Sequence, residues 1–381
     1  MDETAFKTLC GLILSLMICF GVVGNSISFL TWMKGKRCRH LPGSTYLSAL
    51  AVSDNLILCT SGVKYAIELL FTINLWNLNE GACKLLHTTW HLFFLMSTWI
   101  VVSLTIERTI AVVQPLKRAI RTSKKRELLM VLFYFVAFLL INLPFTVGAK
   151  MLESSILSEW NDDSTTYTNA TFDLSLNVNV SNSGAPQSEV TAVKTCQADP
   201  DSFYFKYEDE YHNWFIDFVL LFSAPVLILT VCNVMILVTL CRQKTPLEGT
   251  ESRQYGKSSR SVSGPLTARV IALSAVQCIS VGPFSVAALI PGVLPNVQAV
   301  DTIQFIDRMF IIMALIWYLN NCVNFVLYSL FGKAFRQDCI DVLCGQSGRR
   351  GLGDTSNSLH DSGKHSKSDH TLSESSMNKK Y

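Results

Sequence analysis

Seven long apolar stretches, separated by polar segments, constrain the fold of this chain more than any other feature of its sequence. An α-helix rises about 1.5 Å per residue, so each stretch is long enough to cross the roughly 30 Å hydrocarbon core of a lipid bilayer. The sequence therefore predicts an all-α membrane protein, folded as a seven-transmembrane helix bundle. The expected helices cover about residues 8–33, 44–71, 81–113, 127–149, 212–241, 266–291 and 303–330.

The composition supports a membrane protein, because only 16% of the 381 residues are charged and 49% are hydrophobic. Soluble domains usually carry about 25% charged residues. The first apolar stretch is too long for the h-region of a signal peptide, and the basic segment 34–39 follows it. We therefore expect a signal-anchor, with residues 1–7 as a short extracellular N-terminus. An enzyme is not predicted, since the sequence contains no Walker loop, zinc motif or nucleophile elbow.

The distribution of charge predicts the orientation. Lys and Arg concentrate in segments 34–39, 117–126 and 242–260, which the positive-inside rule places in the cytoplasm. The connection after the fourth stretch is acidic instead, and it contains two N-glycosylation sequons, at Asn169 and Asn179. Both observations favour an extracellular position for this connection. The region after the seventh stretch is then expected in the cytoplasm.

Four of the twelve cysteines occupy positions that suggest a chemical role. Cys83 and Cys196 fall on the oxidising outer side, where they can form a disulfide or remain separate thiols. Cys339 and Cys344 belong to segment 331–344, which we expect to form a short amphipathic eighth helix on the membrane surface. These two cysteines can carry palmitate there, or they can be buried thiols.

Several polar side chains lie at mid-depth in the apolar stretches. An ionisable group inside a bilayer costs a few kcal/mol at least, so such groups indicate functional sites. A carboxylate with several neutral oxygen donors suits a sodium ion or a buried water network, and the alternative is hydrogen bonding for packing alone. No other metal and no cofactor is predicted. The set consists of Asn25, Asp54, Ser97, Asn320 and Asn324.

These residues belong to a series of motifs whose order and spacing resemble the rhodopsin-like (class A) G-protein-coupled receptors. The resemblance covers about residues 10–345. It implies a seven-helix receptor domain, residues 8–330, followed by the eighth helix. It is similar in particular to receptors for neuropeptides, which also combine a short N-terminus with a long second outer loop. The motifs are Gly24-Asn25, Leu50 to Asp54, Trp76 with Cys83, Glu107-Arg108-Thr109, Pro115-Leu116, Pro144, Pro225, Pro283 and Asn324 to Tyr328.

The resemblance implies a disulfide between Cys83 and Cys196, and a plasma-membrane receptor that catalyses nucleotide exchange on a heterotrimeric G protein. At rest Glu107 would pair with Arg108, and an outward movement of helix six would then expose Arg108 to the G protein. Leu116 would pack into a groove of that partner. The residues implied in this switch are Glu107, Arg108, Pro115, Leu116, Asn324 and Tyr328.

The C-terminal tail, residues 345–381, has no apolar period and is expected to be disordered. Its serines, for example Ser373, Ser375 and Ser376, can become a phosphate cluster or can be a solvated spacer. The resemblance implies that receptor kinases and arrestin bind this tail. Membrane lipid is a further expected partner of the basic inner loops, and nucleic acid is not expected.

Four positions depart from the family pattern. Val281 replaces a tryptophan of helix six, Asn233 a tyrosine of helix five, and the usual helix-four tryptophan is missing. Phe325 replaces the proline of helix seven, so we expect that helix to be straighter than in relatives. The base of helix six offers no acidic residue, which excludes an ionic lock between Arg108 and that helix.

The outer halves of the helices indicate the ligand class. Trp90 stands where amine receptors carry Asp, and Tyr318 where opsins carry the retinal-binding Lys, so neither ligand is expected. Lys64 and Asp217 on opposite walls suit a short peptide with a carboxylate and an amine. Alternatively, Lys64 only pairs with Glu68 at i,i+4. The full set of expected ligand contacts is Lys64, Glu68, Trp90, His91, Asp217, Phe284 and Tyr318.

Two other functions are alternatives to a peptide receptor. A chemosensory receptor of the same fold for small molecules is compatible with the departures in helices six and seven. A seven-helix channel, transporter or light-driven pump belongs to a different class. The absence of a retinal lysine and of inverted repeats argues against that class.

Overall fold

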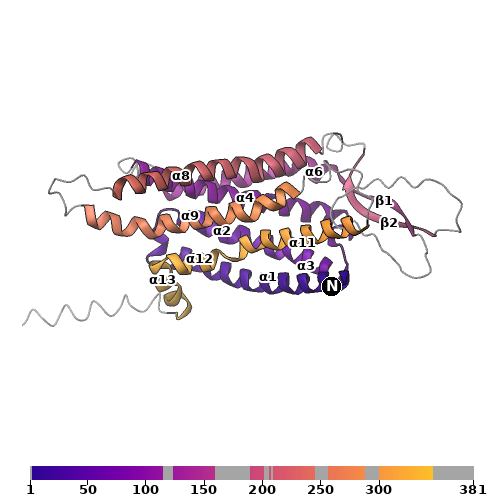
Figure 1. The fold of residues 1–381 in the computed structure, drawn as a ribbon, viewed down its shortest axis with the longest axis horizontal. Coiled ribbons are helices and arrows are strands. Elements are labelled where there is room, and N and C mark those ends of the chain that lie inside the picture. The colour runs from indigo at the N-terminus through magenta and orange to yellow at the C-terminus, as the bar shows by residue number, and fades with distance from the viewer. Residues whose placement is uncertain are drawn as a thin grey trace, which may run out of the picture.

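The computed structural model describes residues 2–114, 123–158, 189–200, 206, 209–244, 256–287 and 300–345. Long helices lie side by side in these ranges, and one two-stranded sheet stands at the same end of the bundle as the N-terminus (Figure 1). Six of the described helices are long and apolar enough to cross a membrane, and a shorter apolar helix, Thr267–Pro283, is the seventh. The predicted seven-helix membrane bundle is confirmed.

The helical elements follow the expected stretches closely. The second, fifth and seventh membrane helices are each built of consecutive pieces, and the short helix α13 lies across one end of the bundle. The bounds are α1 Glu3–Lys34, α2 Ser44–Ile57, η2 Leu58–Gly62, α3 Val63–Phe71, α4 Glu80–Val113, α6 Lys124–Gly148, η5 Asp209–Ser223, α8 Ala224–Lys244, α9 Gly256–Ala287, α11 Val300–Cys322, α12 Asn324–Phe331 and α13 Lys333–Leu343. Short 3-10 turns, η1 Cys38–His40 and η3 Leu75–Asn77, lie in two of the connections.

Two helix ends differ from the expectation. Helix α1 begins at Glu3 rather than near residue 8, because Glu3 forms ion pairs with Lys7 at 3.3 Å and with Arg308 at 3.0 Å. These pairs keep a polar first turn in helical form. Helix α9 begins at Gly256, ahead of the apolar stretch expected from residue 266. Hydropathy alone marks the membrane-embedded part of a helix and misses such polar extensions.

The seventh membrane helix is interrupted although it lacks the family proline. Helix α11 ends at Cys322 and α12 begins at Asn324, with Val323 between them at ψ −9°. The side-chain amide of Asn25 on α1 donates to the backbone oxygen of Asn321 at 2.8 Å. A side chain that bonds into the backbone ladder is one of the known causes of a helix irregularity. The expectation that this helix is straighter than in relatives stays a prediction, and the interruption at Val323 is a feature that the sequence did not predict.

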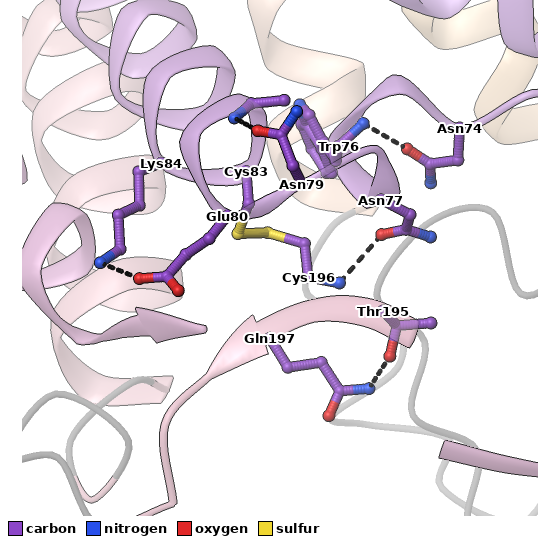
Figure 2. The surroundings of a disulfide bond; sticks show 11 residues. Asn74, Trp76, Asn77, Asn79, Glu80, Cys83, Lys84, Thr195, Cys196 and Gln197 are labelled. Carbon is purple, nitrogen blue, oxygen red and sulfur yellow. Dashed lines mark hydrogen bonds and ion pairs between the residues drawn. A yellow bond between two sulfur atoms is a disulfide. The ribbon is translucent and has the colours of Figure 1, made fainter. Parts of the chain in front are cut away.

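The long connection after α6 begins and ends in a β-hairpin that the sequence did not predict. Strands β1 (Ala149–Ser158) and β2 (Glu189–Ala198) are antiparallel, with Met151 opposite Cys196. Cys196 forms a disulfide with Cys83 in the first turns of α4, with 5.6 Å between the two Cα atoms. Figure 2 shows the backbone N–H of Cys196 donating to the side-chain oxygen of Asn77, at 2.9 Å. The sequons at Asn169 and Asn179 lie outside the described residues.

Candidate functional site

Asp54 occupies the centre of the bundle and joins three helices. Its side chain is fully buried, and Ser97 on α4 donates to Oδ1 at 2.9 Å. The Asn324 amide on α12 donates to Oδ2 at 2.5 Å. The sequence had grouped five polar residues, and the structure brings three of them into one hydrogen-bonded unit. Asn25 and Asn320 have other partners.

Asn320 belongs to a second polar chain, which depends on a residue that the sequence analysis missed. Gln277 on α9 donates from Nε2 to the Thr98 hydroxyl of α4 at 2.9 Å. Asn320 on α11 donates from Nδ2 to Gln277 Oε1 at 2.8 Å. All three side chains are buried. A lone glutamine inside an apolar stretch was the available signal, because an unpaired amide in lipid is costly and needs a partner.

The hydroxyl of Thr105, two turns further along α4, lies 3.3 Å from the hydroxyl of Ser274 on α9. Helix α9 is therefore bonded to α4 at two levels and to α11 at one. Together with the Asp54 unit, these bonds connect the second, third, sixth and seventh membrane helices through polar side chains.

Arg108 lies near the C-terminal end of α4, beside a cavity of about 140 Å³. Its Nη2 atom donates to the backbone oxygen of Pro42 at 2.5 Å. The neighbouring Glu107 keeps a buried Oε2 that has no hydrogen-bond partner in the described part of the chain. The expected resting-state pair between Glu107 and Arg108 stays a prediction, and the structure adds a bond from Arg108 to the backbone that precedes α2. The cavity is lined by Pro42, Tyr46, Ser103, Ile106, Glu107, Arg108, Ile110, Ala111, Arg126, Met130 and Tyr134.

Two buried acids organise the connection between α1 and α2. Glu127 on α6 accepts from the backbone N–H groups of Gly43 at 2.8 Å and Thr45 at 3.1 Å, so its carboxylate caps the N-terminus of α2. Gly43 has a φ of 86°, a left-handed conformation that glycine adopts without strain. Asp338 on α13 accepts from the backbone N–H of Arg37 at 2.7 Å.

Asp338 also accepts from the Cys38 N–H at 2.7 Å and from the Arg37 guanidinium at 2.9 Å. Burial, with a smaller contribution from the Asp338 carboxylate, raises the pKa of the Cys38 thiol to about 12. Cys339, next to Asp338, is also buried, and burial raises the pKa of its thiol. Cys344, one residue after the end of α13, is exposed. The two cysteines of the eighth helix therefore differ in access.

Four of the expected ligand contacts pair with one another. Lys64 and Glu68 are both buried and form an ion pair of 2.6 Å, which is the alternative left open by the sequence. The Lys64 ammonium also lies 4.0 Å from the centre of the Trp76 ring. Asp217 Oδ1 on η5 lies 3.4 Å from His91 Nε2 on α4. Each charged group expected on the pocket walls thus has a partner inside the protein.

Aromatic rings fill the space between these charged groups. The Trp90 ring lies 5.7 Å from that of Trp76 and 5.9 Å from that of Trp317. Tyr318 stacks on Tyr65 at 6.1 Å, and its hydroxyl donates to Ser61 at 3.2 Å. Trp317 also lies 6.4 Å from Tyr318, so Trp90 and Tyr318 belong to one aromatic cluster.

Some expected site residues lie outside the description. Pro115 and Leu116 are not among the described residues, and neither is the tail beyond residue 345. The backbone of Phe284 is part of α9, but its side chain is not described. Tyr328 is fully buried, and its hydroxyl has no hydrogen-bond partner among the residues that the structure covers.

A bundle of apolar membrane-length helices, joined through a buried acid and bound to an outer hairpin by a disulfide, defines a seven-helix membrane receptor architecture. Comparison with known families gives the assignment. The model of the family described as "7 transmembrane receptor (rhodopsin family)" matches residues 24–172 and 166–328, which is well over half of the chain. The protein belongs to this family, as its motifs had suggested.

Two curated relatives are named as receptors, one for a neuropeptide and one for thyrotropin-releasing hormone. The chain is 26% identical over 145 residues to neuropeptide receptor 18 of Caenorhabditis elegans, an alignment that covers 37% of this chain and 30% of the relative. It is 31% identical over 115 residues to the thyrotropin-releasing hormone receptor of Gallus gallus, which covers 30% of this chain and 28% of the relative. The matched segments thus span less than a third of each relative's own length.

Proposed function

We propose that this receptor is activated by a short extracellular peptide and that it catalyses nucleotide exchange on a heterotrimeric G protein. The observation that carries the proposal is the pair of buried polar units at mid-depth, one around Asp54 and one around Gln277. Asp54, Gln277 and Asn320 join four membrane helices between the outer aromatic cluster and the inner end of α4. A ligand that binds one arrangement of these helices more tightly than another shifts the population at the inner end.

The composition of the outer cluster supports a peptide ligand. Aromatic rings such as Trp90 and Tyr318 can stack on peptide side chains, and the Lys64–Glu68 pair offers a cation and an anion side by side. A peptide carboxylate would compete with Glu68 for the Lys64 ammonium, and a peptide amine would approach Asp217. The printed names of the two relatives, a neuropeptide receptor and a hormone receptor, agree with this ligand class.

The inner partners and the location follow from the family and the charge pattern. We propose a plasma-membrane protein with its N-terminus outside, G protein bound near Arg108, and receptor kinases and arrestin bound to the serine-rich tail. Lipid headgroups would contact the basic inner loops. Sodium fits Asp54 as an allosteric ion, because a single carboxylate with the Ser97 hydroxyl supplies hard oxygen ligands and too little charge for a divalent cation.

Replacing Arg108 tests the coupling step. In Arg108→Ala, agonist-stimulated nucleotide exchange on the α-subunit should be lost while peptide binding to intact cells remains measurable. Lys125→Ala is the matched control, since Lys125 is an exposed cation outside the inner cavity. Full coupling of Arg108→Ala would refute the proposed role of this residue.

The Lys64–Glu68 pair allows a sharp test of the ligand. The probe is a library of short peptides, each made with a free carboxylate and with an amidated C-terminus, and read by calcium and cyclic-nucleotide responses. For a peptide that activates the receptor, Lys64→Gln should weaken the free acid more than the amide. Glu68→Gln should strengthen the free acid, because it removes the internal competitor.

Equal effects of these two variants on both peptide forms would exclude a contact between Lys64 and the ligand carboxylate. A second library, of small odorants and metabolites, is screened in parallel on the same cells. Responses to that library with silence toward every peptide would overturn the peptide proposal in favour of a chemosensory receptor.

A further inference from the structure

Arg269 on α9 is a buried cation, and the signalling mechanism proposed above assigns it no role. Only 3% of its surface is exposed. Its Nε and Nη1 atoms are buried and have no hydrogen-bond partner among the described residues. Burying an ionised group without a paired acid is strongly unfavourable. Some other interaction has to hold this guanidinium in place.

Aromatic rings surround the Arg269 guanidinium. Its Cζ atom lies 5.2 Å from the centre of the Trp32 ring on α1 and 5.7 Å from that of Tyr328 on α12. A cation within about 6 Å of a ring centre is attracted by the ring quadrupole, and the attraction is strongest for tryptophan and in desolvated sites. The cation therefore interacts with the faces of aromatic side chains instead of with a carboxylate.

The two rings are themselves held rigidly. Trp32 and Tyr328 meet edge to face at 5.5 Å, and both contact Phe335 of α13, at 5.4 Å each. All three rings are almost fully buried. We call Trp32, Tyr328 and Phe335 the aromatic cage. Arg269 thus binds α9 to a preformed cage that belongs to the first, seventh and eighth helices.

An acidic partner was available at this end of the bundle and is used elsewhere. Asp338 lies on α13, the helix that carries Phe335, but its carboxylate accepts from the backbone of Arg37 and Cys38 and from the Arg37 guanidinium. The sequence also offers Arg108 no acid at the base of α9. The restraint on α9 at the inner end is consequently of a different chemical kind.

We infer, on the basis of the proposed receptor function, that the contact between Arg269 and the aromatic cage is the inner restraint that keeps α9 closed at rest. The closed state is stabilised by the ring faces, but two guanidinium donors have no partner within the part of the chain that the structure describes. An outward movement of α9 brings these donors into water, which offsets part of the lost attraction. The two states then differ little in free energy, so a modest ligand preference can shift the equilibrium.

Graded fluorination of Trp32 tests this inference, because fluorine weakens the ring quadrupole and changes the shape of the ring little. The full chain is purified without ligand, with the exposed cysteines Cys19, Cys59, Cys241 and Cys344 replaced by serine. Spin labels are attached at Ser263→Cys on α9 and Lys125→Cys on α6. Tryptophans with increasing numbers of fluorine atoms are inserted at position 32 by nonsense suppression, and distances between the labels are recorded.

The long-distance population should rise with each added fluorine and reach about tenfold its initial value, which corresponds to about 1.4 kcal/mol. Arg269→Gln should give a similar rise, with Arg269→Lys between it and the unmodified protein. The same fluorinated residues at Trp99 are the control. That ring contacts Tyr134 and Phe138, and its Nε1 donates to the Leu220 oxygen at 3.0 Å. Fluorination there should leave the distances unchanged.

Basal nucleotide exchange, measured on the same samples, separates this inference from the proposed function. If the distances between the labels do not change on fluorination at position 32, the inferred restraint is wrong, whatever the exchange rates are. Distances that respond, without any change in exchange on any α-subunit, would support the restraint and count against G-protein coupling. The fluorination series remains decisive if Arg269→Gln fails to fold.

Discussion

Replacing Gln277 by leucine should destabilise the bundle, because the amide of this residue joins α4, α9 and α11. The change keeps the side-chain size nearly constant and removes both bonds, to Thr98 at 2.9 Å and from Asn320 at 2.8 Å. Interhelical hydrogen bonds inside a membrane contribute about 0.6 kcal/mol on average and about 1.7 kcal/mol at most. Two such bonds give an expected loss of about 1–3 kcal/mol in the free energy of unfolding.

The loss in free energy of unfolding should depend on which hydrogen-bond partners of Gln277 are left unpaired. Gln277→Leu leaves the buried Asn320 amide without its acceptor, which is the costly half of a broken hydrogen bond. When Asn320→Leu and Thr98→Val are added, neither of the two partners of Gln277 is left unpaired, and much of the stability should return. The coupling energy between positions 277 and 320 in a double-mutant cycle should therefore be well above zero.

Thermal unfolding of the purified protein, followed with a thiol-reactive dye, measures these changes through buried free thiols such as Cys10 and Cys322. Ser280→Ala is the control on the same helix. Among the described residues, the Ser280 hydroxyl bonds only to backbone oxygens of α9, those of Val276 at 2.7 Å and Gln277 at 3.3 Å. A coupling energy of zero, or equal destabilisation by Gln277→Leu and Ser280→Ala, would refute the reasoning.

Three further predictions concern the inner end. Glu127→Ala should lower the free energy of unfolding by about 0.5–2 kcal/mol, the range for lost helix caps, and unchanged thermal unfolding would contradict the cap. Palmitate sensitive to hydroxylamine should disappear in Cys344→Ser and persist in Cys339→Ser, because Cys344 is exposed and Cys339 is buried; the reverse pattern would exclude Cys344 as the acylated residue. Maleimide should not label Cys38 at pH 8, since its thiol pKa is about 12. Because this pKa exceeds the ordinary value of 9.0, the unfolded state loses its proton first. The free energy of unfolding should therefore fall as pH rises from 9 toward 12. Asp338→Asn should make this fall less steep. A free energy of unfolding that stays constant over this pH range would refute the raised pKa of Cys38.

The polar residues of the bundle show what the sequence could predict. Asp54, Ser97 and Asn324 were grouped because each is a costly residue in an apolar stretch, and they do meet. The number of membrane helices followed from hydropathy, and the Cys83–Cys196 pairing came with the family resemblance. These predictions rest on signals that are local in the sequence, or on a recognised pattern.

The partners of Glu127 and Asp338 could not be predicted in that way. Glu127 caps a helix that begins 83 residues earlier in the sequence, and Asp338 binds a loop 300 residues away. An acid in a basic loop or on an amphipathic helix gives no sign of such a role. The interruption at Val323 was missed for a similar reason, since its cause is a side chain from α1 and not a local proline.

The connection between α1 and α2 has a consequence for how disturbances travel through the molecule. Its backbone N–H groups at Arg37, Cys38, Gly43 and Thr45 are all held by carboxylates from other helices. These amides should exchange with deuterium slowly although they belong to a short link. Through them, α13 and α6 both bind the same short connection. A lipid attached beside α13 can therefore alter the start of α2 without any rearrangement of the bundle interior.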